Sequence, residues 1–466
     1  MATSIKNAHK SQPGHNFKLK ALNPCVAGID IGAKSIFVCI GFEDGHQEVR
    51  EFYTFTRDLK AMVSWLLQNN IQSVAMESTG VYWIPVYDIL SQAALEVTLV
   101  NAYYLKTVPG RKTDVKDCQW IQQLHAYGLL RGSFRPDDMG VTFRGYVRQR
   151  SRLFELSSQQ IQLMHKALVQ MNLRLHQVVS DITGASGMSI IRAIVAGEED
   201  PHKLAKYRSI RLKRGEDEIV KALEGNYRSE SLLSLKHALE AYDFFHCQVL
   251  ECERAVEQLL NDWKNKQVDE SIEAVPCSKK SKCEKRKPKA GKTMYNKTPY
   301  FFHAEVSLER ILRVDLTSIP GLETNGVMRI LAETGSDMSK WPSSKHFASW
   351  LGLCPGNKIS GGKVLSSKTK PSANKAAQML RMAASSLYHS KSALGAYFRK
   401  MRSRLGAPKA ITATAHKLAK IYYTMLKEGK SFEEIGQAAY EEKYKIRKLL
   451  SLERYAKGMG YRLVAC

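Results

Sequence analysis

The stretch "CVAGIDIG" (residues 25–32) decides the fold class, because it sets an acidic residue, Asp30, inside an apolar, strand-like run. A second β-rich run, "SIFVCIGF", follows at once, and "EDGHQ" supplies a turn before "VREFYTF". Helical patterns at "LKAMVSWLLQNN" and "YWIPVYDILSQAA" then alternate with strand patterns at "IQSVAME" and "LEVTLVN". Strands interleaved with helices predict a parallel or mixed α/β sheet covered by helices, and we assign this domain to residues 24–140.

Four acidic residues stand out in this domain. Asp30 lies in the first strand and Glu77 at the end of "SVAME", while Asp114 and Asp117 lie three apart in "GRKTDVKD" (residues 110–117), at the start of a helical pattern. Residues i and i+3 share one helix face, with Cβ atoms roughly 5–6 Å apart. One interpretation is a simple helix start, with Thr113 as N-cap and Asp114 near the positive end of the helix dipole.

The other interpretation is a metal site. Acids at the strand ends of an open α/β sheet project into the crevice where ligands bind. Four carboxylates facing phosphates suit hard cations such as Mg²⁺ or Mn²⁺, and a metal pair can stabilise both the attacking and the leaving oxygen in phosphoryl transfer. We therefore expect Asp30, Glu77, Asp114 and Asp117 to converge.

The charge of the chain points to a polyanionic partner. Its 466 residues carry a net charge of +25, which favours nucleic acid over an acidic membrane surface. No run approaches the roughly 18 apolar residues that span a bilayer, and residues 1–23 are expected to be a basic, flexible leader. Nine irregularly spaced cysteines without a CxxC pair argue against a disulfide framework or zinc site, and for a reducing cytoplasm.

The middle of the chain, residues 141–265, has a seven-residue apolar period that predicts long helices. One seam consists of Ile161, Met164, Leu168, Met171, Leu175, Val178 and Ile182. A second runs through Leu232, Leu235, Leu239, Tyr242, Val249, Val256, Leu260 and Trp263, interrupted by His246 and Glu253. An intramolecular helical hairpin and an intermolecular coiled coil both fit this period, and no role can be assigned to the stretch between the seams.

The last third of the chain falls into three segments. Residues 266–300 are lysine-rich and low in complexity, typical of a solvated disordered insert or a nucleic-acid arm. Residues 301–430 are mostly helical, with a helix, "IPGL" turn and helix that look like a helix–hairpin–helix, and with Ser360 in a Gly-flanked loop between Lys358 and Lys363. Residues 431–466 form a basic helical tail.

Four stretches together resemble one family. They are "GIDIGAKSI", "MESTGVYWIPVYDIL", "VNAYYLKTVPGRKTDVKDCQWI" and "SIPGLETNGVMRILAETG…FASWLGLCPGNKISGG". The family comprises the insertion-sequence transposases of the IS-one-ten type, which pair a RuvC-like (RNase H-type) DEDD domain with a C-terminal serine-bearing transposase domain and are bridge-RNA-guided DNA recombinases. The resemblance covers about half of the chain.

The resemblance implies a role for each matching residue. Asp30, Glu77, Asp114 and Asp117 would be the tetrad that binds Mg²⁺, with Mn²⁺ as an alternative. Ser360 would attack a DNA phosphate and be held as a phosphoserine link. The implied partners are DNA (element ends and target), a structured bridge-type RNA and further copies of the chain, as a dimer or tetramer aided by the coiled coil. The implied location is the cytoplasm, in association with the nucleoid.

The chain also departs from the family. After "SGG" it reads "KVLSSKTKPSANK", where relatives tend to be rich in Gly and Arg, so Ser366, Ser367 and Ser372 are alternative nucleophiles. A RuvC-like, structure-specific endonuclease that cuts with metal-activated water would need none of these serines. A non-catalytic nucleic-acid scaffold with a degenerate α/β core would need neither the serine nor the four acids.

Overall fold

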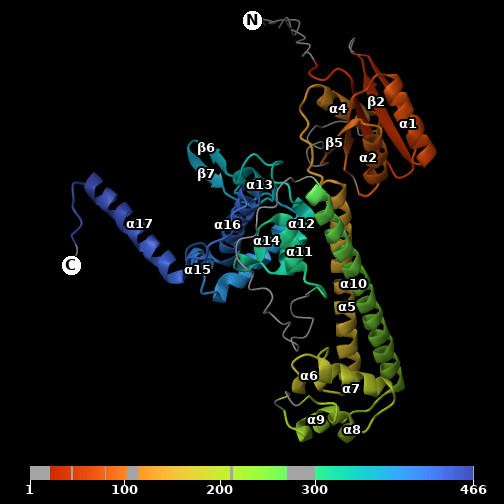
Figure 1. The fold of residues 1–466 in the computed structure, drawn as a ribbon, viewed down its shortest axis with the longest axis vertical. Coiled ribbons are helices and arrows are strands. Elements are labelled where there is room, and N and C mark those ends of the chain that lie inside the picture. The colour runs from red at the N-terminus through yellow and green to blue at the C-terminus, as the bar shows by residue number, and fades with distance from the viewer. Residues whose placement is uncertain are drawn as a thin grey trace, which may run out of the picture. The chain divides into compact units, whose positions relative to one another are not determined.

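The computed structural model describes residues 21–42, 46–78, 80–101, 114–209, 212, 214–269 and 300–464. The chain divides into two compact units, Met1–Arg135 and Pro136–Cys466 (Figure 1). Thr113, residues 43–45 of the expected "EDGHQ" turn and residues 270–299 of the lysine-rich stretch fall outside the described residues. The domain boundaries expected from the sequence stay a prediction.

The first unit is built on a mixed five-stranded sheet. Its order is β3 (Gln47–Tyr53), β2 (Ser35–Gly41), β1 (Val26–Ile31), β4 (Ser73–Glu77) and β5 (Glu96–Val100). The first three strands pair antiparallel as a meander, and β4 and β5 then add in parallel on the other side of β1. The connecting helices are α1 (Thr56–Gln68), α2 (Trp83–Gln92) and α4 (Asp114–Ala126). The predicted α/β domain is confirmed.

The two faces of this sheet carry different cores. One face presents Ile29 and Met76 to an apolar cluster that includes Leu66 of α1 and Leu90 of α2, all of them fully buried. The opposite face is covered by α4, where Ile121 packs with Ala75 and Val100. Because side chains alternate along a strand, this arrangement fixes the direction of every other residue in β1 and β4.

The second unit opens with a pair of long helices, α5 (Asp138–Gln170) and α10 (Ser229–Asp269), which pack against each other within one chain (Figure 1). All residues of the second seam lie on α10, and Leu235 through Trp263 are buried. This is the intramolecular alternative. An intermolecular coiled coil stays a prediction.

The first seam does not form one continuous helix as expected. The helix α5 ends at Gln170, and Asn172 takes the left-handed conformation with φ of 60°. Apolar residues that follow Gln170, such as Met171 and Ile182, still keep their spacing because they enter one core. That core also contains α6 (Leu175–Val178), α7 (Ala185–Val195), α8 (Pro201–Ala205), α9 (Glu216–Leu223) and the start of α10. The stretch between the seams is therefore a small helical cap.

Glu253, which interrupts the second seam, is paired inside the unit. Arg150 of α5 donates to its carboxylate at 2.6 Å, and the two side chains are only 2% and 3% exposed. The Phe301 backbone N–H donates to the same carboxylate at 2.8 Å, and Arg150 also donates to Asn325 at 3.2 Å. The guanidinium lies 3.9 Å from the centre of the Tyr300 ring. This ion pair joins both long helices to the helical part that follows.

That helical part contains α11 (Ala304–Leu312), η2 (Leu316–Ser318), α12 (Thr324–Thr334), α13 (Ser344–Trp350), α14 (Lys375–Ser386), η3 (Leu387–His389), α15 (Ala393–Leu405), α16 (Ala407–Glu428) and α17 (Gly436–Gly458). The segment before "IPGL" is only a 3₁₀ turn, so a full helix–hairpin–helix is not confirmed. No residue of α17 is buried. Within the described part of the chain, no helix is long and apolar enough to cross a membrane.

Candidate active site

Asp30 and Glu77 lie at the same level on neighbouring parallel strands. The register pairs Gly28 with Ala75 and Ile29 with Met76, so Asp30 and Glu77 form the next step at the carboxyl ends of β1 and β4. Ile29 and Met76 point into the apolar core, and alternation therefore turns both acids to the opposite face, the one that α4 covers. Both acids are half-buried. Two predicted site residues are thus brought to one edge of the sheet.

The close approach of α4 to this edge depends on Gly28. A Cβ atom built at Gly28 would lie 2.8 Å from the Gln122 Cα, and closer still to the Gln122 backbone nitrogen and the Cys118 carbonyl oxygen. The backbone of α4 therefore rests directly on β1, in space that any side chain would fill. The absence of a Cβ at this position was not singled out from the sequence, although glycine in a strand often marks such a contact.

Cys118 shows that the Asp30 charge reaches the first turns of α4. A hydrogen bond with the Cys39 thiol and burial raise the pKa of Cys118, and the negative charge of Asp30 raises it further. Both thiols are fully buried, and neither cysteine was a predicted site residue. Asp117, which directly precedes Cys118, is half-buried. Asp30 and the beginning of α4 thus lie near each other.

The predicted i, i+3 pair is placed on a helix, because α4 begins at Asp114 and includes Asp117. The Asp114 side chain lies outside the described atoms, so the helix-start and metal interpretations both remain predictions. Among the side chains that the structure describes, no three His, Cys, Asp or Glu residues gather closely enough to hold a metal ion. The donor set at this edge consists of carboxylates, the ligand type that Mg²⁺ and Mn²⁺ favour.

Ser360 belongs to the other unit, where it lies at the tip of a β-hairpin and not in an irregular loop. It ends β6 (Lys358–Ser360) and pairs with the first residue of β7 (Lys363–Ser366). Gly361 and Gly362 form the two-residue turn with φ of +54° and +76°, the conformation that glycine favours in such hairpins. Ser360 is exposed, as are the two flanking lysines. Its hydroxyl is accessible in a positive local field.

Two of the three alternative serines are less free to react than Ser360. The Ser366 hydroxyl accepts a hydrogen bond from the Lys368 backbone N–H at 3.4 Å, and the Ser372 hydroxyl accepts one from the Asn374 backbone N–H at 3.3 Å. Both are half-buried, whereas Ser360 at the hairpin tip is exposed. Of these three hydroxyls, that of Ser360 is best placed to meet a large substrate.

Two family models match the chain on either side of the helical cap. Residues 27–173 match a transposase model of the DEDD type from IS110 elements, and residues 315–399 match the transposase IS116/IS110/IS902 family. The chain belongs to the IS110 family of transposases. The first match contains all four predicted acids, and the second contains Ser360. A comparison with curated proteins gave no significant match.

Family membership carries a coarse function with it. IS110-family domains support the function of a transposase, an enzyme that cuts and joins DNA, and DNA is its substrate. Transposases of the DEDD type are typically metal-dependent. The roles of individual residues in this chain go beyond what the two matches establish.

Proposed function

We propose that this transposase cuts and rejoins the DNA strands of an insertion sequence through a covalent link to Ser360, assisted by a divalent metal ion that Asp30, Glu77, Asp114 and Asp117 hold. The observation that carries this proposal is the shared level of Asp30 and Glu77 on the face of the sheet that α4 covers. Two half-buried acids side by side repel each other, and a cation held between them would relieve that repulsion, which supports a metal-binding role.

The serine chemistry consists of two exchanges of P–O bonds. The Ser360 oxygen forms a bond to the DNA phosphorus, one P–O bond of the strand breaks, the serine proton is released, and the leaving strand end takes up a proton. The hydroxyl of another strand end later attacks the phosphorus and loses its proton, the bond from phosphorus to the Ser360 oxygen breaks, and that oxygen takes up a proton. One P–O bond replaces another in each step, so no ATP is needed. A serine hydroxyl is weakly nucleophilic, and the lysines beside it favour the ionised form.

In this proposal the acids of the first unit bind the metal ion and thereby orient the DNA phosphate. Asp30 and Glu77 are fixed by the pairing of β1 with β4, and Asp117 by the seat of α4 on Gly28, so they need little rearrangement to act together. A bound Mg²⁺ or Mn²⁺ would polarise the phosphate and stabilise the leaving oxygen. The choice between these ions belongs to the proposal.

The deciding experiment is a search for a protein–DNA adduct. The full-length protein is incubated with DNA that carries the element's ends and then denatured, and covalent complexes are counted. We expect an adduct with the wild type, none with Ser360→Ala, and a normal yield with the control Ser366→Ala. An adduct with Ser360→Ala would assign the nucleophile to another serine, and normal recombination by Ser360→Ala without an adduct would favour the endonuclease that uses water.

A second experiment tests the acids. Asp30→Asn and Asp117→Asn keep the side-chain size but remove a charge, and we expect each to lower strand cleavage by several orders of magnitude while nucleic-acid binding changes little. Asp58→Asn, in the first turn of α1, is the matched control. Wild-type cleavage by Asp117→Asn would reduce that residue to part of a helix start.

We further propose that the protein acts with a structured RNA, and as a homo-oligomer. A chain of charge +25 gains affinity from phosphates without reading sequence, and base pairing can then supply specificity. The protein purified from its host should carry one discrete RNA, and its removal should reduce recombination more than non-specific DNA binding. Full activity of RNA-free protein would refute this part, and light scattering would report the oligomer.

A further inference from the structure

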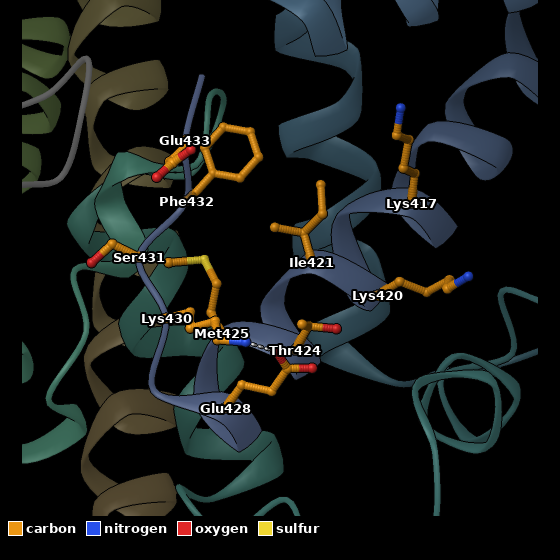
Figure 2. A pocket seen from close by; sticks show the side chains of 10 residues that line it. All are labelled: Lys417, Lys420, Ile421, Thr424, Met425, Glu428, Lys430, Ser431, Phe432 and Glu433. Atoms are coloured by element: carbon orange, nitrogen blue, oxygen red, sulfur yellow. Dashed lines mark hydrogen bonds and ion pairs between the residues drawn. The ribbon is translucent and has the colours of Figure 1, made fainter. Parts of the chain in front are cut away.

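A groove lies on the second unit between α16 and the segment 430–433, beyond both stretches that the family models match. It has a volume of about 770 Å³. Its apolar lining comes from Ile421, Met425 and Phe432. Figure 2 shows the Phe432 ring and the Ile421 side chain turned into the gap between the two segments. This volume is in the usual range for a site that takes one nucleotide-sized group.

Lysines border the apolar lining. Lys417 and Lys420 extend from α16, and Lys430 extends from the opposite segment, where its amino group pairs with Glu428 at 3.1 Å (Figure 2). Lys417 also lies 4.4 Å from the centre of the Tyr397 ring and 5.5 Å from that of Tyr440. The groove thus joins a cationic rim to aromatic rings inside and beside it.

Three lysines and two glutamates, Glu428 and Glu433, line the groove, which lies in a basic part of the chain. Between residues 397 and 464 the chain has sixteen Lys and Arg against six Asp and Glu. Burial, together with the nearby Arg447, lowers the pKa of Lys417, although Glu434 opposes this shift. A second copy of this basic chain would be repelled here, whereas a polyanion would be attracted.

We propose that this groove binds single-stranded nucleic acid, with one unpaired base against Phe432 and the adjacent phosphates on Lys417 and Lys420. Aromatic stacking on unpaired bases combined with lysine contacts to the backbone is the usual chemistry of single-strand recognition. A duplex cannot use the apolar lining, because its bases are already stacked. The inference rests on the proposed function only in taking nucleic acid as the partner.

Photocrosslinking of the full-length protein tests this proposal. Twelve-nucleotide uridine and deoxyuridine oligonucleotides are irradiated with the protein in the presence of excess duplex DNA, and crosslinked peptides are identified by mass spectrometry. We expect crosslinks at Phe432, and the comparison of the two oligonucleotides tells whether RNA or DNA is preferred. Crosslinks confined to other parts of the chain would overturn the proposal.

Affinity measurements supply the second arm. Phe432→Leu keeps an apolar side chain but removes the ring, and we expect single-strand binding to weaken roughly fivefold or more. Phe244→Leu, an exposed phenylalanine on α10, is the matched control and should change nothing. Equal affinities of the two variants, or an equal loss for duplex DNA, would overturn the proposal.

The lysines are tested without touching the apolar lining, so the test survives if Phe432→Leu folds poorly. Lys417→Gln combined with Lys420→Gln should lower the slope of log affinity against log salt by about 0.7 for each phosphate that the protein no longer neutralises. Lys236→Gln on α10 should leave the slope unchanged, and a common slope for all three proteins would contradict the assignment. Because these assays read binding, failure of the serine chemistry would not alter them.

Discussion

The substitution Gly28→Ala tests whether the seat of α4 on β1 organises the candidate active site. The new Cβ would lie 2.8 Å from the Gln122 Cα, whereas ordinary contacts begin at 3.4 Å. Because two further backbone atoms of α4 lie closer still, the helix must move by about 1 Å, and overpacking of this kind costs about 1–3 kcal/mol. We expect the first unit to melt roughly 5–15 °C lower.

The same displacement of α4 should lower the cleavage rate by more than the loss of stability alone would explain. Asp117 moves with α4 while Asp30 and Glu77 stay with the sheet, and a misplacement of about 1 Å can lower a rate by about 100-fold. The assay compares cleavage rates at a temperature where circular dichroism shows that the wild type and the variant are both folded.

Gly41→Ala is the matched control, because its Cβ meets the side-chain amide of the same residue, Gln122, and not the helix backbone. The Gln122 side-chain amide can rotate away from the new Cβ, although it then loses the 2.7 Å hydrogen bond that it accepts from Gln47. We expect a loss of only about 1 kcal/mol and little change in cleavage. If Gly28→Ala melted and cleaved like the wild type, or if both variants lost activity equally, the reasoning would be refuted.

Three further predictions concern stability and the hairpin. Glu253→Gln leaves the buried Arg150 guanidinium uncompensated and should lower the free energy of unfolding in urea by about 3–5 kcal/mol. Asp243→Asn, in the exposed pair with Arg192, should lower it by less than about 1 kcal/mol. Equal losses would refute the distinction between the buried and the exposed pair. Burial lowers the pKa of His125 below its ordinary 6.5, although the nearby Glu96 opposes this shift. The unfolded state therefore binds more protons, and the free energy of unfolding should fall as the pH drops below about 6.5. His125→Gln should flatten that pH profile, and an unchanged profile would contradict this cause. Gly361→Val strains the turn at φ of +54° and should reduce the yield of serine–DNA adduct without a change in overall fold by circular dichroism, while a wild-type yield would show that the turn is not needed.

Much of the first unit could be predicted from its sequence. Each strand and helix expected over residues 24–130 is present, because the changes of apolar period are sharp and glycine or polar residues separate them. Asp30 within "AGIDIG" and Glu77 at the end of "SVAME" suggested a common edge, and the register places them there. The period says nothing of which face α4 covers, so the role of Gly28 emerged only from the structure.

The second unit shows where periodicity misleads. Apolar spacing continued from Ile161 to Ile182 although the helix ends at Gln170, because several short helices share one core. Glu253 looked like a flaw in a seam, and its partner Arg150 could not be identified without the packing of α5 on α10. The hairpin at Ser360 was missed although "ISGGKV" carries a signal for it, two glycines between β-branched residues.

The helix pair α5 and α10 has a mechanical consequence. A helix of 33 residues is about 50 Å long, so α5 would act as a lever with the small helical cap at its far end if its base rotated. A rotation of about 5° at its base carries that end through about 4 Å, close to the ~3.4 Å step between neighbouring nucleotides on one DNA strand. Arg150 lies in the first half of α5, and its buried pair with Glu253 of α10 would resist such a rotation. Weakening the Arg150–Glu253 pair should therefore affect the position of the helical cap before it affects the cleavage chemistry.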